Sequence, residues 1–179
     1  MSNPSQLASK LDDLAISCRL QDLALFTIEG RAERIEKVRK VLSVLSAGVY
    51  LLGAGPYSQR VVSLMCDEVV IGRMSTPLEG ILDRAVDVFV DDGVGLLPRE
   101  VSRVHCAIYR REGTNHHDYW VLDKGSSCGT YLNGEKLEQS QSNSEEEKVR
   151  TSRALTNGDV ISLGLSRINS FVFADLRGQ

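Results

Sequence analysis

Residues 119–134 read YWVLDKGSSCGTYLNG, which places a loop of small residues between two β-prone segments. Within it, Asp123–Gly134 holds three glycines, two adjacent serines, a threonine and an asparagine, with Cys128 in the middle. Glycine permits tight turns, and the N–H groups and hydroxyls of such a turn are typical of phosphate-binding loops. The same composition is also typical of a plain hairpin turn. This stretch alone leaves both interpretations open.

Short β-prone segments extend on both sides of this stretch. Nine of them, divided by turn residues and without helical periodicity between them, predict an antiparallel β-sandwich or barrel. They are VYLL, RVVSLM, EVVIG, VDVFV, HCAIY, YWVLD, GTYL, DVISL and NSFVFA. Two longer connections interrupt them, Met74–Ala85 and the polar stretch 138–153, which we interpret as a solvated loop. Ser142 and Ser144 precede acidic residues there and are candidate sites for an acidophilic kinase, although a mobile solubilising loop is the simpler interpretation.

The first 47 residues show the periodicity of helices instead. One apolar stripe runs from Leu7 to Cys18 and a second from Ile35 to Leu45, with Gly30 between them. We therefore predict a helical N-terminal extension, residues 1–47, before a β domain at residues 48–176. Its stripes must pack on the same chain, form a homodimer or dock into a larger complex.

The overall composition fits one globular domain with an appendage, since the chain has 179 residues, 42% hydrophobic and 25% charged. A net charge of −3 predicts no general attraction to nucleic acid or to anionic membranes. The sequence shows no apolar run near the ~20 residues that span a bilayer and no signal-peptide pattern at its start, which favours the cytosol or nucleus. Its four cysteines are far apart, which is more typical of reduced thiols than of a disulfide framework. Its three histidines are not spaced as metal ligands.

Three further stretches help to decide between the two interpretations of the loop. They are VVIGR, which ends in Gly72-Arg73, VSRVHC at residues 101–106, and LTNGDVISLG at residues 155–164. In order and spacing, these stretches and the loop resemble the forkhead-associated (FHA) domain over roughly residues 49–174. The resemblance implies a β-sandwich that binds phosphothreonine in partner proteins through loops at one end. It implies neither catalysis nor a cofactor.

The resemblance also implies a role for each matching residue. Four residues match positions that contact the phosphate: Arg73, Ser102, Arg103 and Ser127. This set suits the chemistry, because a phosphate dianion requires guanidinium charge and several neutral donors. His105 matches a buried histidine that braces the site. Positions expected to support the turns are Gly72, Gly129, Thr130, Asn133 and Gly134.

Some features of this chain differ from the family pattern or bear on which partners it selects. Cys128 stands where the family commonly has an asparagine that bonds the peptide backbone, and a thiol is a poor donor and acceptor. We therefore expect a weaker grip on the peptide backbone. Arg99 and Glu100 are candidates for sequence preference, favouring acidic and basic partner residues respectively, or are solvated loop charges. The Met74–Ala85 connection is longer than is usual in the family.

Enzymatic interpretations find little support. Gly53-Ala54-Gly55 follows an apolar run, but Ser58 replaces the third glycine of a dinucleotide-binding fingerprint, so we interpret it as a turn. Cys128 has no base placed in sequence to activate it. Cys106 is interpreted as a residue that fills the core or the surface, not as a reactive group.

We therefore expect a non-catalytic module that recruits a phosphothreonine-bearing partner in signalling, the cell cycle or a chromosome-associated complex, in the nucleus by the family's habits. The alternative is a phosphate-independent scaffold or oligomerisation module that works through residues 1–47.

Overall fold

The structure is a computed structural model that describes residues 43, 45–53, 61–76, 85–90, 99–111, 119–142 and 144–177. The predicted helical extension at residues 1–47 lies almost entirely outside these ranges. Residues 54–60, which include most of the Gly-Ala-Gly turn, and residues 77–84 of the first long connection also lie outside them.

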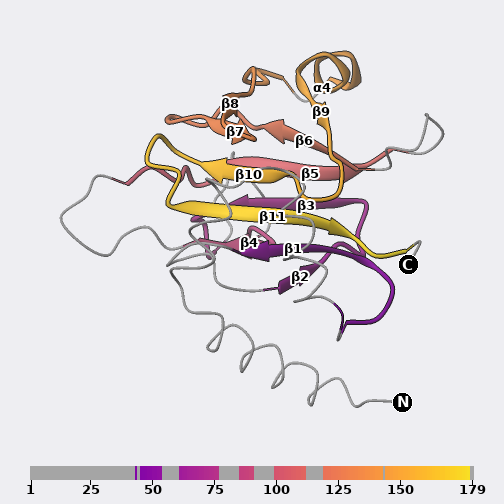
Figure 1. Ribbon diagram of the computed structural model, residues 1–179. Coiled ribbons are helices and arrows are strands. Elements are labelled where there is room, and N and C mark those ends of the chain that lie inside the picture. Colours follow the sequence, from indigo (N-terminus) through magenta and orange to yellow (C-terminus); the bar gives the residue numbers. More distant parts are fainter. Residues whose placement is uncertain are drawn as a thin grey trace.

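The described chain forms a β-sandwich of two sheets (Figure 1). The first sheet has the order β2-β1-β11-β10-β7-β8 and the second the order β4-β3-β5-β6-β9. The strands of the first sheet are β1 (Val49–Gly53), β2 (Val61–Ser63), β7 (Thr130–Leu132), β8 (Glu135–Lys136), β10 (Val160–Leu163) and β11 (Asn169–Asp175). Those of the second are β3 (Glu68–Gly72), β4 (Val88–Phe89), β5 (Cys106–Arg110), β6 (Tyr119–Asp123) and β9 (Arg153–Ala154).

This architecture confirms the predicted β-sandwich, because each of the nine predicted segments contains a strand. Among the described strands, neighbours pair antiparallel except β3 and β4, which run parallel. The two strands that the sequence did not predict, β8 and β9, have two residues each and lie at sheet edges.

Apolar side chains from both sheets fill the space between them. Leu51 and Phe171 of the first sheet are fully buried with Ile71 and Ile108 of the second. Burying a side chain of this size contributes about 1.5–3 kcal/mol, so this shared core holds the sheets together. Cys106 belongs to this core, which decides between the core and surface positions that the sequence left open. Its burial together with the charge of Asp123 raises the pKa of its thiol.

The stretch 138–153 corrects the prediction of a solvated loop, because it contains helix α4 (Glu145–Thr151) (Figure 1). The Ser144 hydroxyl caps α4 by accepting from the Glu147 N–H at 3.3 Å. Acidic residues in its first turn and basic residues in its last complement the helix dipole. Only Thr151 of α4 is buried, so the helix has no apolar stripe that the sequence could reveal.

The strand register gathers the segments that the sequence singled out. Ile71 of β3 pairs with Cys106 of β5, which pairs in turn with Asp123 of β6. The end of β3, the start of β5 and the end of β6 therefore meet at one end of the second sheet. Among the described residues, no helix is long and apolar enough to cross a membrane.

Candidate functional site

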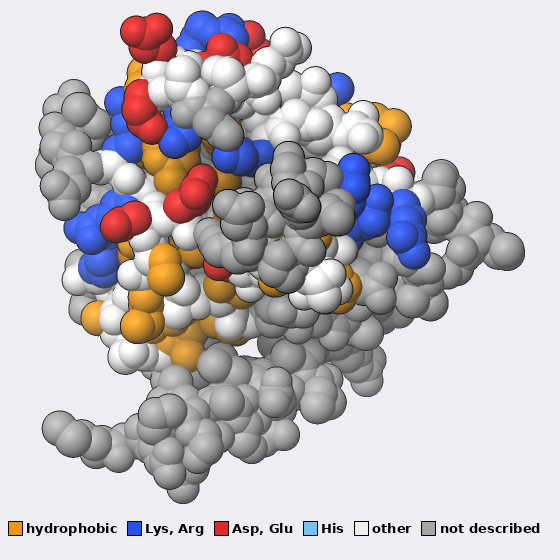
Figure 2. All heavy atoms as spheres, turned by 180° about the vertical axis from the view of Figure 1, so that it is seen from behind, with side chains coloured by type: hydrophobic (Ala, Val, Ile, Leu, Met, Phe, Trp, Pro, Cys, Tyr) orange, Lys and Arg blue, Asp and Glu red, His pale blue; other side chains and the backbone are white. Residues whose placement is uncertain are grey.

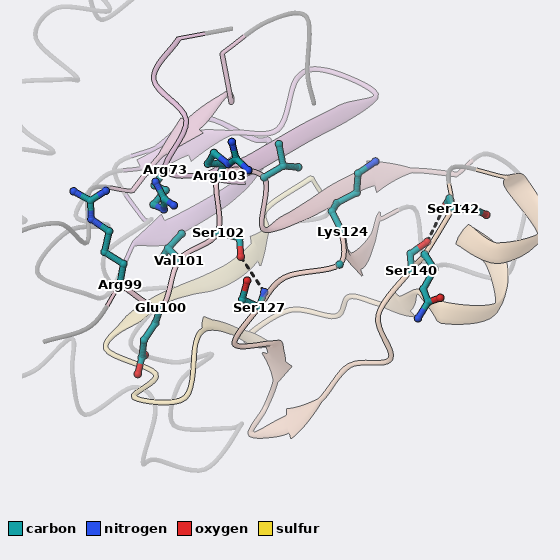
Figure 3. Close-up of a pocket in the computed structure, with 13 residues that line it drawn as sticks. Arg73, Arg99, Glu100, Val101, Ser102, Arg103, Lys124, Ser127, Ser140 and Ser142 are labelled. Carbon is teal, nitrogen blue, oxygen red and sulfur yellow. Dashed lines mark hydrogen bonds between the residues drawn. The ribbon is translucent and has the colours of Figure 1, made fainter. Parts of the chain in front are cut away.

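A pocket of about 480 Å³ opens at this end of the sandwich (Figure 3). Arg73 and residues 99–104 line one part of it, and Lys124, Gly125, Ser127 and residues 140–142 line the other. The pocket therefore brings together Arg73, Ser102, Arg103 and Ser127. The first and last of them are 54 positions apart in the sequence. It also includes Lys124 and residues 140–142, which the sequence reasoning did not select.

Close backbone packing at Gly72 fixes the position of Arg73. The Arg73 and Met74 N–H groups donate to the Ser102 and Arg103 carbonyls at 3.1 and 3.2 Å. A Cβ on Gly72 would stand 2.2 Å from the Arg103 carbonyl oxygen, far inside contact distance. Only glycine allows the end of β3 to lie this close to the segment that carries Ser102 and Arg103.

Arg73 is half-buried, and its Nε is fully buried without a hydrogen-bond partner among the residues that the structure describes. Leaving a buried donor unpaired costs free energy, and such groups are rare in folded proteins. Because Arg73 lines the pocket, an anion bound there would have this guanidinium available. Arg103, on the neighbouring segment, is exposed and also lines the pocket.

Ser102 and Ser127 lie next to each other in the lining of the pocket (Figure 3). The Ser127 N–H donates to the Ser102 Oγ at 3.0 Å. This bond occupies an acceptor position of the Ser102 hydroxyl, so the hydroxyl hydrogen remains able to donate to a ligand. Ser127 is exposed, and its own hydroxyl adds a second neutral donor.

His105 lies behind the pocket and is fully buried. Its Nδ1 accepts from the Ser102 N–H at 3.0 Å, so Nε2 carries the ring hydrogen and donates to the Gly129 carbonyl at 3.1 Å. The ring thus joins the Ser102 segment to the turn that follows Ser127. Its position makes it a brace for both walls, and it does not line the pocket.

Asp123 organises the inside of the turn. Its buried carboxylate accepts from the N–H and hydroxyl of Ser126, at 2.7 and 2.6 Å, and from the N–H and hydroxyl of Thr130, both at 2.7 Å. The Ser126 Oγ also accepts from the Gly129 N–H at 2.9 Å. Sequence reasoning missed Asp123 and Ser126. The available signal was an Asp at a strand end followed by Gly and Ser, because Asp side chains commonly accept from nearby backbone N–H groups in such turns.

Asn133 and Gly134 form the turn between β7 and β8, with φ of 51° and 91°. The Asn133 side chain donates to Asp159 Oδ1 at 2.9 Å and accepts from the Val160 N–H at 3.0 Å. These bonds tie the turn to the start of β10. Gly129 also has a positive φ, of 85°, which favours glycine at that position of the preceding turn.

The remaining candidates differ in their surroundings. Cys128 is half-buried, is a free thiol and does not line the pocket. Arg99 is exposed at the pocket. Glu100 is not a simple solvated charge, because its Oε2 accepts from the N–H and hydroxyl of Ser166, at 2.9 and 2.6 Å. In Figure 3 its side chain points away from Arg73 and Arg103.

Comparisons with known proteins agree with this fold. The family model for the FHA domain matches residues 69–164, more than half of the chain. Full-length Pml1p from yeast has a similar structure, with a TM-score of 0.52 and 16% sequence identity over 79% of this chain and 91% of that one. At this identity the likeness shows the fold alone.

Two other solved structures resemble the chain less closely. The FHA domain of CT664 from Chlamydia trachomatis has a TM-score of 0.47 and 20% identity over 71% of this chain and 96% of that one. EmbR from Mycobacterium tuberculosis, solved with a low-affinity phosphopeptide, has a TM-score of 0.48 and 23% identity over 83% of this chain and 30% of that one. Among curated protein sequences, none matches this chain.

Proposed function

Since this chain belongs to the FHA domain family, whose members are interaction modules, we propose that it binds phosphothreonine and thereby recruits a kinase-modified partner protein. The observation that carries the proposal is the buried, unpartnered Nε of Arg73 in a pocket that also holds Ser102, Arg103 and Ser127. The proposed activity is binding without catalysis.

The pocket supplies what a phosphate dianion requires. Arg73 and Arg103 bring charge and paired donors in a fixed geometry, while Ser102 and Ser127 bring hydroxyl donors. Each hydrogen bond to a charged group contributes about 1.5–3 kcal/mol. Four of them would account for most of the ~8 kcal/mol of a micromolar complex, before the cost of ordering the peptide. An acidic protein can thus hold an anion in a local basic pocket.

Peptide binding by the full chain tests this proposal. We expect a degenerate phosphothreonine peptide pool to bind in a fluorescence-anisotropy titration and its unphosphorylated counterpart not to bind. Arg73→Ala and Ser102→Ala should each abolish binding, because each removes a proposed phosphate donor. Thermal unfolding of both variants should stay close to that of the wild type.

Arg153→Ala provides the control, since Arg153 is an exposed arginine of β9 that does not line the pocket. It should bind like the wild type. Equal binding by the wild type, Arg73→Ala and Ser102→Ala would contradict the site. Binding that does not depend on phosphorylation would favour the phosphate-independent scaffold instead.

A further inference from the structure

The first sheet has a second apolar side, which faces away from the second sheet. Along β1, Val49 and Leu51 belong to the core between the sheets. Because side chains alternate along a strand, Tyr50 and Leu52 point away from that core. They belong to a separate apolar group, which we call the outward cluster. Its buried residues are Tyr50, Leu52, Val160, Val172, Ala174 and Leu176.

An apolar group in this position is unusual, since the outer side of an antiparallel sandwich is commonly polar and solvated. The view of the molecule from behind (Figure 2) shows such a surface in part, with basic and acidic side chains beside one another. In the outward cluster, by contrast, Leu52 is 6% exposed and Val172 is 0% exposed. Side chains that are buried this deeply, yet outside the core between the sheets, require a further layer of chain over them.

The outward cluster extends across four neighbouring strands. Pairing of β2, β1, β11 and β10 aligns one apolar residue from each strand in a row, formed by Val61, Leu52, Val172 and Val160. At a strand spacing of about 4.8 Å, this row is roughly 14 Å long. The layer that covers it must therefore present an apolar surface of similar length.

The segment that precedes β1 is fixed on this same side of the sheet. Leu45 is half-buried and packs against the outward cluster. The Tyr50 hydroxyl donates to the Ser46 carbonyl at 2.9 Å, and the Leu176 N–H donates to the Gly48 carbonyl at 2.8 Å. Two members of the cluster thus hold residues 46 and 48 in place. The chain therefore enters β1 from the side of the sheet that carries the outward cluster.

Leu45 is also the last residue of the second apolar stripe in the sequence. Upstream of it, the stripe continues through Leu42, Val38 and Ile35, which are three or four positions apart. Side chains at this spacing share one side of a helix, so a helix that ends with Leu45 on the outward cluster would turn the others toward it. A helix from residue 35 to residue 45 is about 15 Å long, which matches the row across the four strands.

We propose that the outward cluster is the docking surface for residues 31–42 of the same chain, which pack on it as an amphipathic helix and add a third layer to the domain. The short tether between Leu45 and β1 favours this occupant over a second copy, because such tethers give an effective concentration on the order of millimolar. The second stripe is then used within the chain. Of residues 1–47, the first stripe, from Leu7 to Cys18, is left for contact with another protein.

Thiol labelling of the full chain tests this docking. Val172→Cys places a thiol of similar size in the row, and iodoacetamide labelling is followed at each cysteine by peptide mass spectrometry. We expect the new thiol to react at least about 100-fold more slowly than the exposed Cys66, because a buried thiol reacts only through local opening. Adding Leu42→Asp should raise the rate at the new thiol by about tenfold or more, since a charge in the stripe opposes its burial.

Lys40→Asp is the matched control, because Lys40 lies on the opposite side of the predicted helix from the stripe. It introduces the same side chain and should leave the rate at the new thiol within about twofold. Cys106, in the core between the sheets, should stay unmodified in every variant, which shows that the sandwich remains folded. If Leu42→Asp exposes Cys106, the milder Leu42→Ala replaces it and should raise the rate by about threefold or more.

Three results would overturn the inference. Equal labelling rates at the new thiol and at Cys66 would show that the outward cluster is open to solvent. Equal rates at the new thiol in the Leu42 and Lys40 variants would show that the stripe does not cover it. Protection that is lost on dilution, together with a dimer in light scattering, would assign the surface to a second copy. These measurements use no phosphopeptide, so their result is independent of the proposed function.

Discussion

The inner and outer faces of one turn, residues 123–130, differ sharply in their surroundings. On the inner face, Asp123, Ser126 and Thr130 are buried, and the Asp123 carboxylate accepts from both Ser126 and Thr130. On the outer face, Lys124 and Ser127 line the pocket. Adjacent residues of similar polarity therefore have separate tasks, since the inner face fixes the shape of the turn and the outer face is free to meet a ligand.

Removing the centre of the inner face should have the largest effect. Asp123→Ala leaves the N–H and hydroxyl groups of Ser126 and Thr130 without their acceptor. We expect the free energy of unfolding to fall by about 3–5 kcal/mol in urea denaturation. Asp175→Ala is the control, because Asp175 bonds Arg177 at the surface and should cost less than about 1 kcal/mol. Similar losses for the two variants would show that the inner face is not a stabilising centre.

Gly72→Ala should damage both stability and binding. The added Cβ would press on the Arg103 carbonyl and displace the segment that holds Ser102. We expect a loss of about 1–3 kcal/mol in urea denaturation and no measurable binding of the phosphothreonine pool. Gly134→Ala, at a positive φ outside the pocket, should lose about 1–2 kcal/mol and bind normally. Normal binding by Gly72→Ala would refute the requirement for close backbone packing there.

The adjacent serines test the comparison most directly. Ser126→Ala removes a hydroxyl bonded to both Asp123 and Gly129, so we expect a loss of about 1–3 kcal/mol in the free energy of unfolding. Ser127→Ala should change that quantity by less than about 0.5 kcal/mol and weaken phosphothreonine binding by about tenfold. Urea denaturation and anisotropy on both variants measure the two effects. The reverse assignment of effects would show that the two faces are exchanged.

The smallest effect is expected at Cys128, whose thiol replaces the asparagine common in the family. Cys128→Asn should tighten phosphothreonine binding by about two- to fivefold, because an amide gives the peptide backbone a stronger hydrogen-bonding partner. Cys66→Asn, at an exposed position outside the pocket, should leave affinity unchanged. Binding about tenfold weaker in Cys128→Asn would show that the thiol makes a contact of its own.

The sequence predicted the sandwich because its nine strands are apolar and bounded by turn residues. It also selected Arg73, Ser102, Arg103 and Ser127, which the register of β3, β5 and β6 brings into one pocket. It could not show that the Glu100 carboxylate bonds Ser166, since these residues meet only through the tertiary fold.

Helix α4 and the buried inner face of the turn at residues 123–130 could not be predicted from the sequence, for related reasons. The seven residues of α4 bury only Thr151, so the helix leaves no apolar period in the sequence. Asp123 looks like an ordinary turn residue until its burial is known, because four donors converge on it only in the folded chain.

The central place of β11 in the first sheet has a consequence for folding. β11 pairs with β10 on one side and with β1 on the other, and Val49 is opposite Asp175. Contacts between such distant parts of a chain slow folding toward the millisecond-to-second range. During synthesis, the edge of β1 that pairs with β11 stays unpaired until almost the whole domain has been made. We therefore expect newly made chains to depend on protection from aggregation until β11 is available.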